Sequence, residues 1–113
     1  MVHFKEQYFY RKISYSVHEA NTFFSRLKGL MFKKTLLDNE ALWIRPCNSI
    51  HMCFMFFPID VIFLDQNKQI VKLVSNLQPW KFIRPVKNAY SVLELPVNTI
   101  ERSNLKVGEY LEF

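Results

Sequence analysis

The sequence predicts a mostly β protein, a β-sandwich or barrel with one short helix near its N-terminus. Two observations favour this class. Beyond residue 40, short apolar or alternating runs are separated by prolines and polar turn residues, which is typical of strands. The chain has 113 residues, of which 50% are hydrophobic. It is long enough for one core and too short for two, so residues 1–113 are expected to form a single domain.

The helix is predicted directly after Ser16. Ser16 and Glu19 have the spacing of a capping box, in which each side chain satisfies a backbone N–H group of the first turn. The apolar residues recur at helical spacing and form one stripe for packing on a sheet, namely Val17, Ala20, Phe23, Phe24 and Leu27. Lys28 complements the C-terminal dipole and Gly29 supplies a left-handed cap, so the helix is expected over residues 17–28.

The remaining elements are expected to be strands. They cover residues 2–15, 41–44, 50–57, 59–64, 70–74, 90–95 and 110–113. Pro58 separates the third of these strands from the fourth. Residues 65–68 are polar and form a turn, so the strands on either side of them are expected to pair as a hairpin. Two prolines, Pro79 and Pro85, frame an irregular stretch.

Composition excludes some classes of protein. Gly29 and Gly108 are the only glycines, so P-loop and dinucleotide-binding loops, which need several close glycines, are excluded. No apolar run approaches the roughly 20 residues that span a bilayer, and no signal-peptide pattern is present. Cys47 and Cys53 would lie about 20 Å apart in an extended segment, so free thiols are expected. We therefore expect a soluble, cytoplasmic protein that does not bind membranes. Its formal charge of +5 is scattered along the chain, which serves solubility.

The candidate site begins in residues 49–65, where His51 and Asp60 interrupt an otherwise apolar segment. Ionisable groups lose hydration when such a segment is buried, and they persist only if they are hydrogen-bonded, paired or neutralised. For Asp60 we favour a structural role, in which the carboxylate accepts backbone N–H groups left unpaired beside the break at Pro58. A functional carboxylate is the alternative.

His51 lies about 7 Å from Cys53 and about 13 Å from Cys47, Cα to Cα, if the segment is extended. These residue types could bind a metal, or could act as a cysteine nucleophile with a histidine base. The third ligand lies too far away for one ion, and no group that would orient the imidazole is evident. We therefore expect a core histidine bonded to a backbone carbonyl, with no metal and no cofactor.

Glu94 and Arg26 are further candidates. Glu94 alternates with apolar neighbours, which favours a position with Val92 on a wet face of its strand. Arg26 borders the apolar stripe of the predicted helix, and its stem can cover apolar surface while its head reaches a buried carboxylate. The hypothesis is that Arg26 pairs with Asp60 or with Glu94.

Residues 80–87 form a second candidate surface, because cations such as Arg84 alternate there with aromatic and aliphatic residues. Exposed aromatic rings beside cations can bind single-stranded nucleic acid or a phosphorylated ligand. We favour the alternative in which Trp80 and Phe82 anchor the loop to the core while the cations stay hydrated. No nucleic-acid motif accompanies the loop, so nucleic acid is not the expected partner.

Five motifs in order carry a resemblance to a known family. They are residues 26–31 (RLKGLM), 47–51 (CNSIH), 55–65 (MFFPIDVIFLD), 92–96 (VLELP) and 107–109 (VGE). From Ser16 onward the chain resembles the bacterial and archaeal domain of unknown function 192 family. The resemblance implies a jelly-roll β-sandwich with a short helix, no established activity and no catalytic residues to transfer. The chain departs from the family pattern at Asn98, where a glycine is usual, and asparagine tolerates the same left-handed turn.

Three functions stay open. The first is a non-enzymatic binding or accessory module, whose cleft takes a small polar or anionic ligand or a protein segment. The candidate binding residues are Arg26, His51, Asp60, Trp80, Arg84 and Glu94. The second is a small hydrolase that uses Asp60 or Glu94 with His51. The third is a nucleic-acid binder that uses residues 80–87. A bacterial source is expected, and the sequence does not indicate an oligomeric state.

Overall fold

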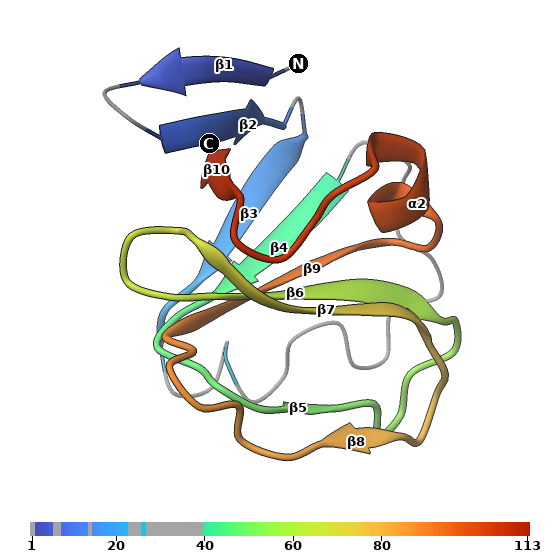
Figure 1. The fold of residues 1–113 in the computed structure, drawn as a ribbon. Helices are drawn as coiled ribbons and strands as arrows, with labels where there is room; N and C mark the ends of the chain where they lie inside the picture. The colour runs from blue at the N-terminus through green and yellow to red at the C-terminus, as the bar shows by residue number, and fades with distance from the viewer. Residues whose placement is uncertain (1, 6–7, 14, 23–25, 27–39) are drawn as a thin grey trace.

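The computed structural model describes residues 2–5, 8–13, 15–22, 26 and 40–113 (Figure 1). The strands are β1 (Val2–Lys5), β2 (Tyr8–Lys12), β3 (Ser16–Ala20), β4 (Glu40–Ile44), β5 (Ile50–His51), β6 (Ile59–Leu64), β7 (Ile70–Leu77), β8 (Phe82–Ile83), β9 (Ser91–Pro96) and β10 (Tyr110–Glu112). A short helix, α2 (Thr99–Ser103), follows β9. None of the helices in these ranges is long and apolar enough to cross a membrane.

The strands form three sheets. The central sheet has the order β3-β4-β9-β6-β7, a second sheet has the order β1-β2-β10, and β5 pairs with β8. The pairs β3 with β4 and β2 with β10 are parallel. In Figure 1, α2 lies above the central sheet and the β5–β8 ribbon lies below it. The described chain is mostly β with one short helix, whereas the sandwich and jelly-roll arrangement stays a prediction.

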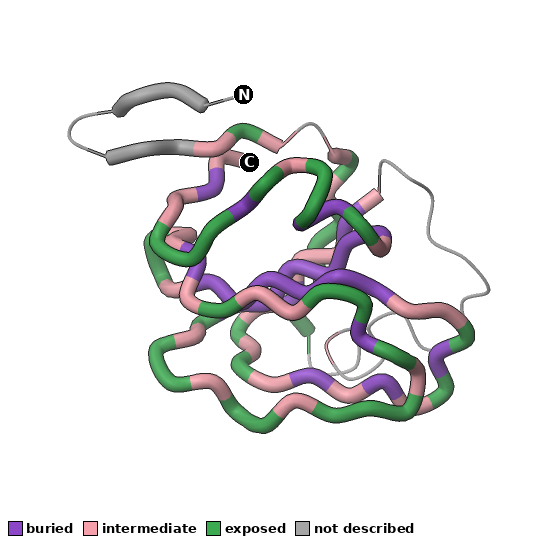
Figure 2. Tube along the Cα trace, turned by 45° about the vertical axis from the view of Figure 1, so that its right-hand side comes forward, coloured by how far each residue is buried: buried purple, intermediate pink, exposed green. Residues whose placement is uncertain are grey.

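The core surrounds β6 and β9, which are buried along their whole length. Side chains alternate between the two faces of the sheet, so each face has a cluster of its own. The lower cluster comprises Ala20, Ile44, Ile50, Met52, Met55, Ile59, Val61, Phe63, Leu77 and Val92. The upper cluster comprises Ala41, Ile62, Leu64, Ile70, Leu93, Leu95, Ile100, Leu105 and Leu111. Figure 2 shows the buried stretches gathered in the middle of the molecule.

The helix predicted over residues 17–28 is wrong at its start, because Ser16–Ala20 is strand β3. Val17 packs against the upper cluster and Ala20 belongs to the lower one. Residues three apart share one face of a helix, whereas in a strand they point to opposite faces. The parallel pairing with β4 places this segment in the sheet and overrides the local helix signal of the capping box.

Part of the predicted helix lies outside the described residues, namely 23–25 and 27–28 together with the expected cap at Gly29. The backbone N–H of Arg26 donates to the oxygen of Thr22 at 2.9 Å, which is a bond of helical spacing. Arg26 itself therefore has helical backbone hydrogen bonding.

Most of the predicted strands are confirmed with adjusted ends. The predicted hairpin is formed by β6 and β7, and Oδ1 of Asp65 accepts the N–H groups of Asn67 and Gln69 in its turn. Residues 2–15 hold two strands rather than one, β1 and β2, and β3 begins directly after this range. The strand predicted over residues 50–57 is limited to β5, since Phe54 has a left-handed φ of 61° that ends the extended geometry. Neither β8 nor α2 was predicted.

Candidate functional site

Asp60 is fully buried and connects three elements through its carboxylate. Oδ1 accepts the backbone N–H of Asn76 in β7 at 2.9 Å, and Oδ2 accepts that of Ile100 in α2 at 2.9 Å. Ile100 lies in the first turn of α2, whose N-cap residue, Asn98, makes no side-chain cap bond. Asp60 thus satisfies one N–H group of α2 that has no intrahelical partner and one N–H group of β7. The structural role predicted for Asp60, acceptance of backbone N–H groups, is confirmed, but the donors belong to β7 and α2 rather than to the chain at Pro58.

Asp60 and His51 do not lie together. Asp60 alternates with Ile59 and Val61 of the lower cluster, and it bonds to α2 above the central sheet. His51 belongs to β5, below the sheet. The predicted cleft lined by both residues is therefore wrong, because the sheet separates them.

Glu94 is buried, so the predicted wet strand face is wrong. Only 2% of its surface is exposed, because β9 lies between β4 and β6 in the sheet. The strand register sets Glu94 opposite Leu42 on one side and Val61 on the other, next to the lower cluster. Burial raises the pKa of Glu94 from 4.5 to about 8, and Oε1 has no hydrogen-bond partner among the described residues. The carboxyl group is therefore mainly protonated at neutral pH.

Arg26 pairs with neither carboxylate, so that prediction is also wrong. Nη1 of Arg26 donates to the backbone oxygen of Asn21 at 3.1 Å. Both oxygens of Asp60 are occupied by backbone donors. Within the ranges that the structure describes, no ion pair joins Arg26 to Glu94. The two carboxylates lie on different faces of the sheet and have no common cationic partner in the part of the chain that the structure describes.

Cys47 and Cys53 are free thiols, as predicted. Burial raises the pKa of the Cys47 thiol, and its Sγ donates to the backbone oxygen of Ser49 at 3.0 Å. A thiol that stays protonated is a poor nucleophile. The backbone N–H of Cys53 donates to Nδ1 of His51 at 3.3 Å. Among the described side chains, no three His, Cys, Asp or Glu residues gather as a metal site would need.

Two segments run side by side below the central sheet (Figure 1). They are residues 46–57 and 78–90, and together we call them the arm. Backbone bonds of 2.8 Å join them, from Cys47 to Tyr90, Met52 to Lys81, Trp80 to Met52 and Val86 to Asn48. In the β5–β8 pair, Ile50 lies opposite Ile83, and both pack in the lower cluster. The alternate pair, His51 and Phe82, therefore faces away from the core.

The arm exposes five aromatic side chains, with exposed fractions of 46% for Phe54, 63% for Phe56, 63% for Trp80, 61% for Phe82 and 37% for Tyr90. The prediction that Trp80 and Phe82 anchor the loop to the core is therefore wrong. Arg84 lies on the same arm and is exposed, as are Lys81 and Lys87. Of the six predicted binding residues, His51, Trp80 and Arg84 lie on the arm, whereas Arg26, Asp60 and Glu94 do not.

A hollow at the base of the arm differs from the predicted cleft. Its volume is about 250 Å³, and its lining residues are Pro46, Cys47, Asn48, Ala89 and Tyr90. None of the six predicted binding residues lines it. The sequence also failed to single out Phe54 and Phe56, because their apolar run predicts a buried strand. Glycine or asparagine usually marks a left-handed turn, and Phe54 is neither, so no local signal was available.

Comparisons with known proteins agree on one family. The model of DUF192, described as uncharacterized ACR, matches residues 7–113. A UPF0127 protein of Pyrococcus furiosus is 39% identical over 106 residues, which cover 91% of this chain and 90% of that protein. A UPF0127 protein of Thermococcus sibiricus is 39% identical over 100 residues, 83% of this chain but only 63% of that protein. These two relatives are archaeal, so a bacterial source stays a prediction.

Two solved structures have a similar fold. A protein of unknown function from Novosphingobium aromaticivorans aligns with a TM-score of 0.77 over 94% of this chain and 76% of that one, at 23% identity. A putative transcription regulator from Sinorhizobium meliloti aligns with a TM-score of 0.73 over 83% of this chain and 78% of that one, also at 23% identity. At this identity the likeness concerns the fold alone. The family match and the archaeal relatives, which bear the name UPF0127, go further and show that the chain belongs to the DUF192 family.

Proposed function

We propose that this protein is a non-enzymatic binding module, and that the arm is its binding surface for an acidic, partly apolar segment of another protein. The observation that carries the proposal is the exposure of five aromatic side chains on one arm. Single exposed apolar residues are common, whereas a group of large ones marks a site of interaction. Aromatic residues also supply most of the binding energy in protein interfaces.

Backbone strain at two of these aromatic residues supports the proposal. Phe54 has a φ of 61° and Trp80 a φ of 67°, a region that bulky side chains rarely occupy. The two rings contact each other edge to face, with centroids 5.0 Å apart and planes at 61°. Strain of this kind costs about 1–3 kcal/mol per residue and is concentrated at functional sites. Here it holds two large rings together at the surface, where folding alone gains little from them.

Charge favours an acidic partner segment. Three cations, Lys81, Arg84 and Lys87, are exposed on the arm within seven residues of one another. Asp and Glu side chains of a partner would find complementary charge there, which raises the association rate and helps to set the orientation. The exposed rings outnumber these cations, so apolar contacts rather than phosphate neutralisation dominate the surface. For this reason we place a protein segment ahead of single-stranded nucleic acid.

The hydrolase alternative lacks an assembled site. Both carboxylate oxygens of Asp60 accept backbone N–H groups, and Glu94 is buried on the lower face of the central sheet. His51 belongs to β5 on the arm, with Nδ1 bonded to the backbone of Cys53. A general acid and base must reach one substrate together. None of these three residues lines the hollow at the base of the arm or the one beside α2.

Selection from a displayed library of 12-residue peptides tests the proposed function. We expect enrichment of peptides that combine Asp or Glu with aromatic or aliphatic residues. Their affinity is expected to fall at least about tenfold for Trp80→Asn, because interface hot spots are rich in Trp. Val107→Asn is the matched control, since Val107 is 61% exposed but lies outside the arm. Peptides that bind Trp80→Asn as tightly as the unaltered protein, or tighter binding of a 12-nucleotide oligothymidine, would overturn the proposal.

Trp80→Asn is itself expected to fold well. Asparagine tolerates the left-handed conformation, so relief of strain offsets the lost contact with Phe54. We expect the free energy of unfolding to change by less than about 1 kcal/mol, whereas truncation of a buried aromatic residue costs about 3–5 kcal/mol. Urea denaturation measures the change. A loss of several kcal/mol would mean that Trp80 serves the fold rather than binding.

A further inference from the structure

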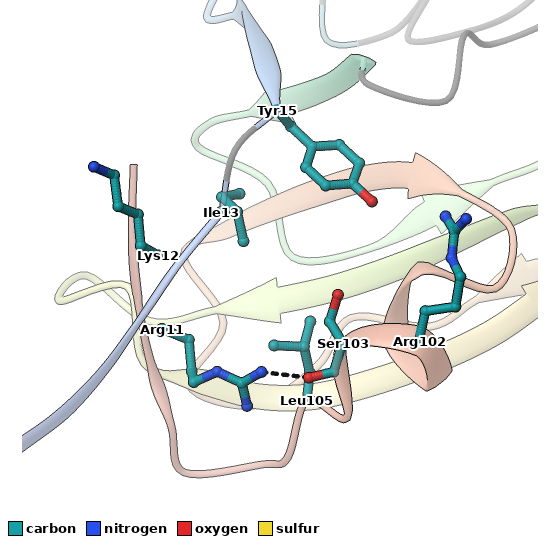
Figure 3. Close-up of a pocket in the computed structure, with 7 residues that line it drawn as sticks. All are labelled: Arg11, Lys12, Ile13, Tyr15, Arg102, Ser103 and Leu105. Atoms are coloured by element: carbon teal, nitrogen blue, oxygen red, sulfur yellow. Dashed lines mark hydrogen bonds between the residues drawn. The ribbon is translucent and has the colours of Figure 1, made fainter. Parts of the chain in front are cut away.

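A second hollow lies above the central sheet, where β2 passes the end of α2 (Figure 3). The hollow there has a volume of about 280 Å³. Its lining residues are Arg11, Lys12, Ile13, Tyr15, Arg102, Ser103 and Leu105. Roughly ninety residues of sequence separate the two halves of this lining. The parallel pairing of β2 with β10 brings them together, which is why no local motif predicted the site.

The polar lining is cationic. Arg11, Lys12 and Arg102 line the hollow, and no carboxylate does. Two acidic residues lie close by, since Glu109 pairs with Arg11 at 3.2 Å and Glu112 lies opposite Lys12 in the strand register. Arg102 has no ion-pair partner among the described residues. The hollow therefore presents positive charge that the described carboxylates do not fully balance.

The Arg11 guanidinium group is held in place before any ligand arrives. Its two terminal nitrogens donate to the backbone oxygens of Ser103 and Asn104 and to the carboxylate of Glu109. Nε of the same group is buried and has no partner among the described residues. A fixed cation loses little conformational freedom when an anion binds, and it costs no reorganisation.

Two hydroxyl groups and two apolar side chains complete the lining. In Figure 3 the Tyr15 ring extends over the hollow toward Arg102, and Ser103 lies between the two arginines. The Tyr15 hydroxyl donates to Oγ1 of Thr99 at 3.2 Å, which fixes the ring. Ile13 and Leu105 supply apolar surface. This combination of cations, hydroxyl groups and an apolar wall suits an organic anion better than a bare inorganic one.

We propose that this hollow binds a small organic anion, with a phosphate or carboxylate group held by Arg102 and Lys12 beside the fixed Arg11, and an apolar part against Ile13 and Leu105. The volume is at the lower end of that of small-molecule sites, which limits the ligand to a compact one. The site is independent of the arm, because the central sheet lies between them. Failure of one proposal leaves the other unaffected.

Titration with phenyl phosphate, benzoate, inorganic phosphate and benzyl alcohol, followed by amide chemical shifts, tests this site. We expect one or both aromatic anions to shift the amides of Ile13, Ser103 and Leu105 and to bind at least about tenfold more tightly than inorganic phosphate or benzyl alcohol. Comparison of the two aromatic anions distinguishes a phosphate from a carboxylate ligand. Equal affinity for inorganic phosphate would indicate an adventitious ion only, and absent shifts at these amides would overturn the proposal.

Arg102→Ala provides the second test, because this side chain makes no hydrogen bond or ion pair in the described structure and its removal should leave the fold intact. Loss of one charge-assisted bond is expected to weaken binding of the aromatic anion about tenfold, and Arg102→Lys should keep part of the affinity. Arg84→Ala, which removes an exposed arginine on the arm, is the matched control and should change nothing. Equal weakening by Arg84→Ala would mean general attraction to a basic protein and would contradict the site.

Discussion

Replacing Asp60 with alanine is expected to lower the free energy of unfolding by about 3–5 kcal/mol. Two hydrogen bonds to a buried carboxylate are lost, each worth about 1.5–3 kcal/mol. The bond from Ile100 is fully buried, so its N–H group is left without an acceptor in a place where water replaces it poorly, whereas the bond from Asn76 is part-buried. Urea denaturation followed by fluorescence measures the loss, and an unchanged m-value shows that the unfolded state is unaffected.

Asp65 offers a matched control for Asp60. Its Oδ1 atom also accepts two backbone N–H groups, those of Asn67 and Gln69, at 2.8 and 2.9 Å. Asp65 lies in a half-buried turn, where water can take over both bonds, so Asp65→Ala should cost only about 1 kcal/mol. Equal losses in the two variants would contradict the argument that burial makes the Asp60 bonds valuable. Asp60→Asn should fall between them, because an amide keeps one acceptor oxygen.

Local chemistry predicted those features whose partners lie nearby in the sequence. The β6–β7 hairpin follows from a polar turn between two apolar runs, and the turn forms as expected. A left-handed backbone at Asn98 was implied by the family resemblance, in which a glycine is usual there, and its φ is 75°. The role of Asp60 was predicted for a related reason, since Pro58 interrupts the strand and leaves donors unpaired. Its second partner, Ile100, lies 40 residues away and was not predictable.

The failures arise from partners distant in sequence. The segment Ser16–Ala20 has a helix pattern, but pairing with β4 decides its conformation. The sequence predicts that Trp80 anchors its loop to the core. The pairing of β5 with β8 and the left-handed backbone at Phe54 instead place the rings on the surface. The hollow around Arg102 depends on two strands from opposite ends of the chain. In each case periodicity describes one segment, whereas the outcome depends on its neighbour in the sheet.

Glu94 is the clearest case in which a local pattern misleads. Alternation with apolar residues predicts a solvent-exposed strand face only where one face of the sheet is uncovered. In β9 both faces are covered, and Glu94 carries an abnormal pKa of about 8 as a result. The unfolded chain releases this proton near pH 4.5, and the folded chain keeps it until about pH 8. Between these values the folded state binds more protons, so stability falls as pH rises, by about 1.4 kcal/mol per pH unit.

Replacing Glu94 with glutamine is therefore expected to stabilise the protein above pH 5 and to remove this pH dependence. The neutral amide resembles the protonated carboxyl group, but it has no proton to lose and no charge to bury. At pH 7 the free energy of unfolding should rise by about 3 kcal/mol. In the unaltered protein, ionisation of Glu94 stabilises the unfolded chain over the roughly 2.5 pH units between its unfolded pKa of 4.5 and pH 7, and glutamine removes this effect. Urea denaturation at pH 5, 6, 7 and 8 measures this change in the free energy of unfolding.

Glu101→Gln is the control, because Glu101 is an exposed carboxylate on α2, and it should leave the pH dependence of stability unchanged. Parallel stability profiles for Glu94→Gln and the unaltered protein would mean that the Glu94 carboxylate is charged in the folded state, as on a wet strand face.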